Sequence, residues 1–172
     1  MGVEKAILLK DDSVRDSYSV ARALAEELKR LAPDCILFGK QSIDYSDEQI
    51  PGIIGEILGI PSVSVIVKFE IKDNRIICER EIEGGREIVE ATLPVILTAQ
   101  KGLNEPRYPS LKGIMSAKTK PIEERPAAPF ARAIEVISMQ KPPAKPAGRI
   151  VGTDATAVAE LVRLLHEEAK VI

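Results

Sequence analysis

Short apolar runs alternate with helical patterns in the first part of the chain. Residues 5–9 and 36–38 are apolar enough to form buried strands. Between them, apolar positions three or four apart predict a helix that Ser13 caps and Pro33 ends. Its expected apolar face consists of Val14, Tyr18, Ala21, Ala25, Leu28 and Leu31. A second helix is expected around 49–58, and this order of elements predicts an α/β fold with parallel strands.

β-branched residues dominate the next stretch. Asp73-Asn74 and the two-residue turn Gly84-Gly85 separate apolar runs that are typical of hairpin strands. The expected strands cover residues 63–71, 75–82, 86–91 and 93–98. The sequence therefore predicts an antiparallel hairpin insertion beside a parallel sheet.

Charge and proline are unevenly distributed along the 172 residues. Residues 1–100 carry a net charge of −6 and residues 101–145 a net charge of +5, and eight of the 12 prolines fall between Pro106 and Pro146. Because prolines interrupt helices and central strands, this region is expected to be extended. The predicted parts are an α/β domain over 1–122 with a partner-recognition loop at 99–121, and an arm with a terminal helix over 123–172.

The terminal helix is expected to start at Gly152-Thr153-Asp154. Its apolar stripe consists of Val158, Leu161, Val162 and Leu165. His166, the only histidine, lies near the end of this helix, where a cation suits the helix dipole. One histidine leaves almost nothing from which to build a catalytic triad or a histidine metal site.

Composition excludes several classes of function. The net charge is −2 and the six aromatic residues include no Trp, so neither electrostatics nor base stacking favours nucleic acid. No apolar run is long enough to cross a membrane. Cys35 and Cys78 cannot form a disulfide framework and are expected to be small core or half-buried residues. The expected compartment is the cytoplasm.

The turn from Gly39 to Gln49 is the first candidate site, because it follows a buried strand and opens a helix. Free N–H groups at the helix start could bind a phosphate, and Lys40 could add positive charge. The turn matches no glycine-rich dinucleotide or Walker motif, and its acidic residues would repel phosphate unless they faced ribose, a cation or solvent. An ordinary capped helix with solvated acids is the alternative.

The second candidate is the segment 100–115, which combines prolines, charges and three apolar residues at helical spacing. These are Leu111, Ile114 and Met115. One interpretation is a helix packed on its own domain. The other is a protruding loop whose apolar knob binds a protein partner.

Both candidates resemble motifs of the electron transfer flavoprotein β subunit. The segment from Asn104 to Ile122 is similar to that family's signature, and Gly39-Lys40-Gln41-Ser42-Ile43-Asp44 resembles its nucleotide loop. Gly84-Gly85 and the ending 169–172 also resemble the family.

The resemblance implies an adenine-nucleotide α-hydrolase-like, Rossmann-like fold and a role as an electron carrier subunit that is not an enzyme by itself. The implied partners are an α subunit that shares an FAD, dehydrogenase donors such as the acyl-CoA dehydrogenases of fatty acid β-oxidation, and a quinone oxidoreductase acceptor. It implies an AMP in the β subunit, or a second FAD in electron-bifurcating members that use NADH. The cofactor-binding residues implied are Gly39, Lys40, Gln41, Ser42, Ile43, Asp44, Gln49 and Ile50. The partner-docking residues implied are Asn104, Glu105, Pro106, Arg107, Tyr108, Leu111, Ile114 and Met115.

The chain also departs from the family pattern. Its start resembles an internal segment, so a truncated or split product is expected relative to the family. Asp44-Tyr45-Ser46-Asp47 matches neither the acidic triplet of AMP-binding members nor the motif of bifurcating members, and AMP is the favoured nucleotide. Gln100-Lys101-Gly102 replaces the usual residues before the signature, which suggests a different choice of partner.

Two readings from other classes remain. A nucleotide sensor of the same fold would need no protruding partner loop. A hydrolase or ligase acting on adenylates would need a nucleophile or a catalytic lysine set, and the sequence offers neither.

Overall fold

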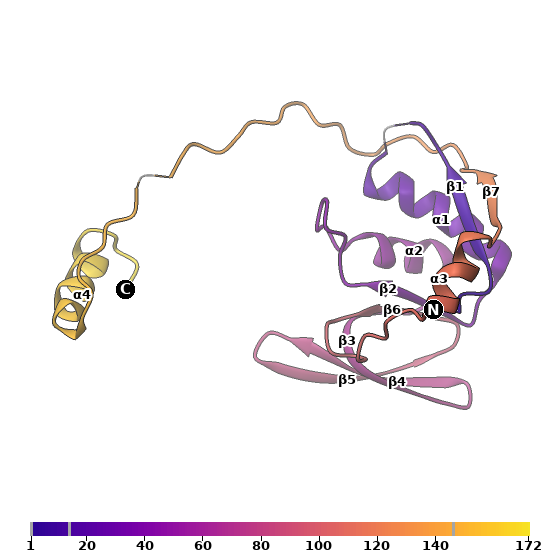
Figure 1. The fold of residues 1–172 in the computed structure, drawn as a ribbon, viewed down its shortest axis with the longest axis horizontal. Coiled ribbons are helices and arrows are strands. Elements are labelled where there is room, and N and C mark those ends of the chain that lie inside the picture. The colour runs from indigo at the N-terminus through magenta and orange to yellow at the C-terminus, as the bar shows by residue number, and fades with distance from the viewer. Residues whose placement is uncertain (1, 14, 146) are drawn as a thin grey trace. The chain divides into compact units, whose positions relative to one another are not determined.

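A five-stranded sheet forms one layer of the first part of the chain, with two helices on one of its faces (Figure 1). The computed structural model describes residues 2–13, 15–145 and 147–172. Its contacts divide the chain into two units, Met1–Glu135 and Val136–Ile172. The elements of the first unit are β1 (Ala6–Lys10), α1 (Ser17–Leu31), β2 (Cys35–Gly39), α2 (Ile50–Leu58), β3 (Ser62–Lys72), β4 (Arg75–Ile82), β5 (Gly85–Thr92), β6 (Val95–Ala99), α3 (Leu111–Lys118) and β7 (Ile122–Pro126).

The five-stranded sheet has the strand order β2-β6-β3-β4-β5 and is mixed, as the sequence predicts. β2, β6 and β3 run parallel to one another, and β3, β4 and β5 form an antiparallel meander. The turn between β4 and β5 differs from the predicted turn Gly84-Gly85 by one residue. Gly85 pairs with Ile82 and belongs to β5, so the turn residues are Glu83 and Gly84. Gly84 has a φ of 82°, a value that glycine adopts without the steric cost of a side chain.

β1 lies outside this sheet and pairs in parallel with β7, Ala6 opposite Ile122. The sequence predicts β1 but not its partner, because residues 123–126 were expected to belong to an extended arm. Pro126 ends β7 at the sheet margin, where the missing proline N–H is tolerated. The two units divide after Glu135, whereas the sequence placed its boundary after Ile122.

The start of α1 also differs from the prediction. Asp16, not Ser13, caps the helix: its carboxylate accepts from the Ser19 N–H, and the Ser19 hydroxyl accepts from the Asp16 N–H. This reciprocal pair is a capping box. The Ser13 N–H instead donates to Asp11 Oδ1 at 2.8 Å. Val14, expected on the apolar face of this helix, lies outside the described residues.

Two apolar cores lie on opposite faces of the sheet, because successive side chains of β6 alternate between them. Ile96 packs against the helices α1 and α2, which lie side by side on one face of the sheet (Figure 1). Val95 and Leu97 pack on the other face with the meander and with Cys78. Gly55 lets α2 approach the sheet closely, since a Cβ there would lie 3.1 Å from Ser62 Cβ. Both cysteines pack in or against a core, as predicted.

A buried carboxylate on α1 joins this helix to β7. Glu27 is 5% exposed, and Arg125 of β7 donates to its Oε1. Arg30 lies 3.5 Å from the other carboxylate oxygen. A buried carboxylate that loses a cationic partner is costly, whereas an apolar pair of similar volume costs little.

We therefore expect Arg125→Leu to lower the urea midpoint of unfolding, and Arg125→Leu combined with Glu27→Leu to restore most of it. Lys5→Leu is the control, because its ion pair with Glu123 on the same small sheet is exposed. Equal midpoints for the single and double variants would contradict the expected role of the buried pair.

The second unit contains a one-turn 3-10 helix, η1 (Ala155–Ala157), followed by α4 (Val158–Glu167). Asp154 caps this start by accepting from the Thr156 N–H at 2.9 Å, which agrees with the predicted start of the helix. Within the predicted stripe, Val158, Leu161 and Val162 are exposed, and Leu164 is the buried residue of α4. His166 is exposed in the last turn, as predicted.

Candidate functional site

The candidate site lies where β2 and β6 end side by side. Because these strands are parallel, their last residues, Gly39 and Ala99, lie side by side at the same end of the sheet. The Lys40 N–H donates to the Ala99 carbonyl at 3.1 Å. The chain then turns through residues 40–49 at this end of the sheet and enters α2. In open α/β sheets, ligands bind at such carboxyl ends of strands.

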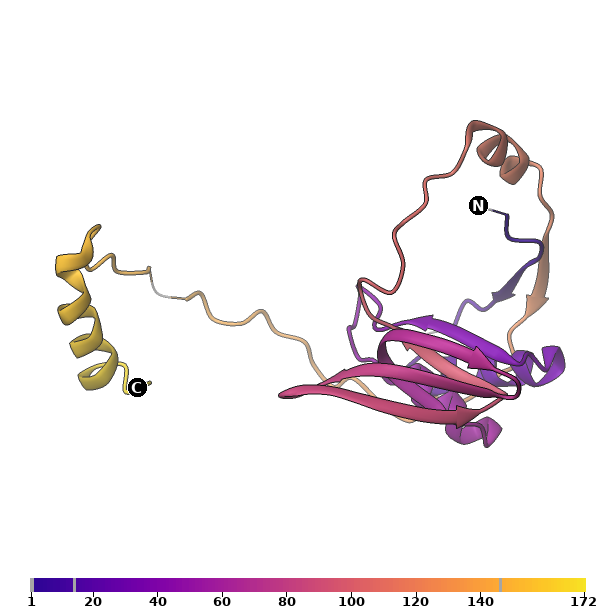
Figure 2. The same ribbon diagram turned by 90° about the horizontal axis from the view of Figure 1, so that it is seen from below.

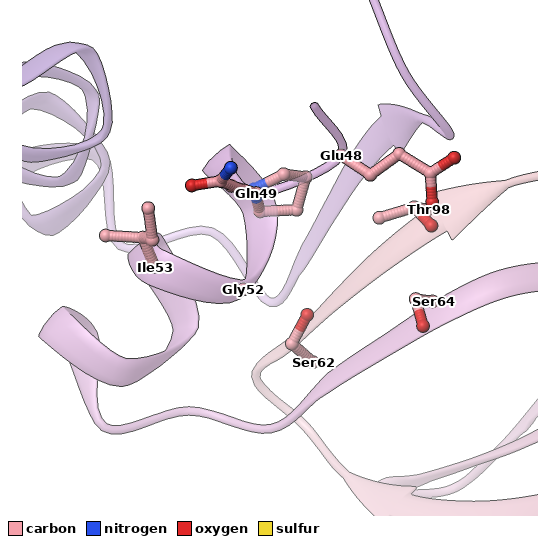
Figure 3. A pocket seen from close by; sticks show the side chains of 8 residues that line it. Glu48, Gln49, Gly52, Ile53, Ser62, Ser64 and Thr98 are labelled. Carbon is pink, nitrogen blue, oxygen red and sulfur yellow. The ribbon is translucent and has the colours of Figure 1, made fainter. Parts of the chain in front are cut away.

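Two hollows flank the start of α2. The larger, about 460 Å³, lies between the helix and the strands β3 and β6 (Figure 3). Its lining residues are Glu48, Gln49, Pro51, Gly52, Ile53, Ser62, Ser64 and Thr98. The smaller, about 240 Å³, lies on the side of the turn and of α1. Its lining residues are Leu24, Phe38, Gly39, Lys40, Gln41, Ser42, Asp47, Glu48, Ile50 and Pro51.

The structure brings together six of the eight residues predicted to bind a cofactor. Gly39, Lys40, Gln41, Ser42 and Ile50 line the smaller hollow, and Gln49 lines the larger one. The other two do not line either hollow: Ile43 is fully exposed, and Asp44 is exposed on the same turn. The Ser42 side chain hydrogen-bonds the Asp44 carboxylate, which lowers the pKa of Asp44 below its ordinary value.

The first turn of α2 carries no side-chain cap. Gln49, at the N-cap position, makes no capping hydrogen bond, and Pro51 has no N–H to offer. The N–H groups of Ile50 and Gly52 therefore lie at the positive end of the helix dipole between the two hollows. Lys40 Nζ lies 3.5 Å from Glu48 Oε1, so the positive charge predicted here is balanced by a neighbouring carboxylate.

A bulge in β3 shapes the larger hollow. The pairing of β3 with β6 shifts register between Val63 and Ile66, and Val65 has a φ of 60°. That value is strained for a β-branched residue. The hydroxyl of Thr98, which is 3% exposed, accepts from the Val65 N–H at 2.8 Å and holds this conformation.

Thr98→Val should therefore destabilise the protein by about 1–3 kcal/mol, because it leaves the N–H of Val65 without an acceptor at a strained position. Thr98→Ser keeps the acceptor and is the matched control. Urea unfolding of both variants provides the measurement. A Val variant as stable as the Ser variant would show that the hydroxyl does not support the bulge.

The second candidate segment projects from the sheet between β6 and β7 (Figure 2). Ser110 caps α3 by accepting from the Gly113 N–H at 3.1 Å. Among its described residues α3 buries none, and Leu111 is 77% exposed. Tyr108, Ile114 and Met115 are exposed as well. The geometry thus favours the protruding loop over the helix packed on its own domain.

Comparison with known proteins identifies a family over most of the chain. Residues 1–130 match the model of the electron transfer flavoprotein domain. Electron transfer flavoprotein subunit beta from Syntrophomonas wolfei is 41% identical over 148 residues, which cover 86% of this chain and 59% of the relative. The protein of that name from Bacillus subtilis is 41% identical over 186 residues, covering all of this chain and 71% of the relative.

The chain belongs to the electron transfer flavoprotein β-subunit family. A third relative, electron transfer flavoprotein subunit beta from Bradyrhizobium diazoefficiens, is 34% identical and covers all of this chain and 69% of the relative. The chain thus spans about 59–71% of the length of these three curated relatives.

The strand side of the larger hollow was not predicted from the sequence. The sequence predicts Ser64 and Thr98 only as strand residues and assigns Ser62 to no element, although all three line the larger hollow. The available signal was a threonine in the otherwise apolar run of β6, together with serines alternating with Val63. Neither pattern is specific enough to identify a binding site.

Within residues 2–13, 15–145 and 147–172, no group of three or more His, Cys, Asp or Glu side chains could hold a metal ion. No helix in the same described part of the chain is long and apolar enough to cross a membrane.

Proposed function

We propose that the chain acts as a β subunit of an electron-carrying flavoprotein, paired with an α subunit with which it shares an FAD. The observation that carries this proposal is α3, a capped helix that buries none of its described residues and presents Leu111 to solvent. A partner-docking role accounts for such a surface, whereas a nucleotide sensor of the same fold would not need it. The named relatives are all electron transfer flavoprotein β subunits.

The site at α2 fits a mononucleotide. The larger hollow, about 460 Å³, is in the size range of small-molecule sites, and the uncapped helix start offers backbone donors to a phosphate. The hydroxyls of Ser62, Ser64 and Thr98 suit the polar groups of a ribose. We propose AMP as the occupant, with a second FAD as the alternative. Tyr45, which belongs to the segment 44–47 that departs from both family motifs, is exposed and lines neither hollow, so it does not favour either nucleotide.

The proposed role divides the work between flavin and protein. The shared FAD supplies the redox chemistry, and the chain supplies binding and orientation. Dehydrogenases such as acyl-CoA dehydrogenases are the proposed donors, docking at 99–121, and a quinone oxidoreductase is the proposed acceptor, which places the protein in fatty acid β-oxidation. An NADH-linked bifurcating flavoprotein is the alternative. The α subunit is the proposed partner of residues 123–172.

Co-expression with the cognate α subunit tests this proposal. We expect a one-to-one complex that is yellow, and mass spectrometry of the released nucleotides should find FAD and AMP in equal amounts. Two FAD per complex and no AMP would instead support the bifurcating alternative. A chain that purifies colourless and without the α subunit would overturn the proposal.

A further inference from the structure

The segment that follows β7 is fastened to α1. Residues 127–134, here called the strap, begin where the Ala127 N–H donates to the Lys10 carbonyl at 2.9 Å. From there the chain passes beside α1, more than 100 residues away in sequence (Figure 1). The first unit ends at Glu135, one residue beyond the strap.

Asp16 binds both the helix and the strap. One carboxylate oxygen accepts from the Ser19 N–H at 2.8 Å and caps α1. The other accepts from the N–H groups of Ala133 at 2.6 Å and Ile134 at 2.8 Å. These hydrogen bonds hold the pKa of Asp16 well below its ordinary value, and the one from the Ser19 N–H has the largest effect.

Two arginines of the same region hold the middle of the strap. Arg15, whose side chain is 12% exposed, donates to the Ala128 carbonyl at 2.9 Å and to the Ser19 carbonyl at 3.1 Å. The Arg22 guanidinium lies 4.2 Å from the centre of the Phe130 ring, a cation–π distance. A backbone carbonyl, an aromatic ring and two amides of the strap are therefore bound by side chains that lie just before α1 and in its second turn.

We propose that Asp16, Arg15 and Arg22 form a latch that fixes the point from which residues 136–172 leave the first unit, so that this arm binds its protein partner with less loss of chain entropy. The strap is already ordered in the free chain, so association with the partner does not include the entropy cost of ordering these residues. The partner in this proposal rests on the proposed function, in which the α subunit binds residues 123–172. Residues 136–172 are the part of that arm that lies beyond the first unit. Asp16 is thus a positioning residue for subunit association.

Asp16→Asn separates the latch from the cap. Asparagine is as good an N-cap as aspartate, but its single oxygen cannot serve the helix and the strap at once. If the asparagine oxygen accepts from the Ser19 N–H, the asparagine NH₂ faces the N–H groups of Ala133 and Ile134. Both sides are then hydrogen-bond donors, so the strap loses its acceptor. Asp16→Ser is the second variant, because serine also caps helices but is too short to place a second oxygen at the strap. Asp12→Asn removes a charge from the same loop and is the matched control.

The test combines amide exchange on the full chain with its affinity for the cognate α subunit. We expect exchange at Ala133 and Ile134 to accelerate at least tenfold in both Asp16 variants, with α1 amides beyond the first turn unchanged, and α-subunit affinity to fall about tenfold. The Asp12 variant should match the wild type in both measurements. Retained protection of Ala133 and Ile134, or faster exchange there with unchanged affinity, would overturn the latch. A wild-type chain that does not bind the α subunit would overturn the proposed function, and the exchange data would still decide whether Asp16 holds the strap.

Discussion

Gly52→Glu should abolish most nucleotide binding without destabilising the protein. Gly52 is the third residue of α2 and lines the larger hollow, and apart from its chain neighbours and the backbone of its own helix no atom lies within 4 Å of the position that a Cβ would take. A glutamate fits there and suits the helix N-terminus, and it is a better helix former than glycine. The same carboxylate would repel a phosphate bound to the N–H groups of the first turn. At about 5 Å and an effective dielectric constant of about 20, one such repulsion costs about 3 kcal/mol and lowers affinity about two hundredfold.

Gly52→Gln is the matched control, because glutamine has nearly the same shape and no charge. Calorimetric titration of AMP into the nucleotide-free complex with the α subunit provides the affinity, and thermal unfolding provides the stability. We expect the Gln variant to lose only a few-fold in affinity and both variants to melt no lower than the wild type. If the two variants bind AMP equally, the phosphate does not lie at the start of α2.

Leu111→Ala should slow electron transfer from the donor dehydrogenase about thirtyfold while leaving the melting temperature unchanged. A leucine side chain that becomes fully buried in a partner contributes about 2 kcal/mol, which is about thirtyfold in affinity. Leu111 is 77% exposed in this chain, so its truncation leaves no cavity here. Lys112, Lys118 and Lys120 are exposed nearby, and we expect them to attract an acidic partner and to make association slower at high salt.

Ile88→Ala is the matched control for Leu111. Ile88 is a similarly exposed apolar residue, but it lies on β5, outside the proposed docking segment. Reduction of the complex by an acyl-CoA dehydrogenase, measured at limiting complex concentration, should be normal in this variant. Equal rates for Leu111→Ala and the wild type, or a lower melting temperature with a normal rate, would contradict the docking role.

The local elements of the fold were predictable because each has a short-range signal. The periodicity of α1, the β-branched run of β3 and the buried run of β6 all lie where the sequence placed them. The pairing of β1 with β7 was not predictable, since the two strands lie more than 100 residues apart and β7 carries the charged run Glu123-Glu124-Arg125. The cap of α1 was placed three residues early, because Ser13 and Asp16 are both good caps and only the tertiary position of Asp16 decides between them.

The candidate site was predictable only on its loop side. The turn after β2 and the exposed segment 100–115 stand out in the sequence, because both contain motifs that resemble those of the electron transfer flavoprotein β subunit. The larger hollow depends instead on a backbone bulge at Val65 and on the closeness of β3 and β6. Such features depend on how strands pair across the sheet, and the composition of a single segment does not report them.

The flavin absorbance of the complex with the α subunit, followed while an acyl-CoA dehydrogenase and its substrate are added, tests the central claim most directly. If the chain acts as an electron-carrier β subunit, the purified complex contains flavin, and the flavin is reduced at a rate that depends on the concentration of dehydrogenase. The rate should fall about thirtyfold with Leu111→Ala and remain normal with Ile88→Ala. A complex without flavin, or a flavin that neither the dehydrogenase nor NADH reduces, would contradict the account.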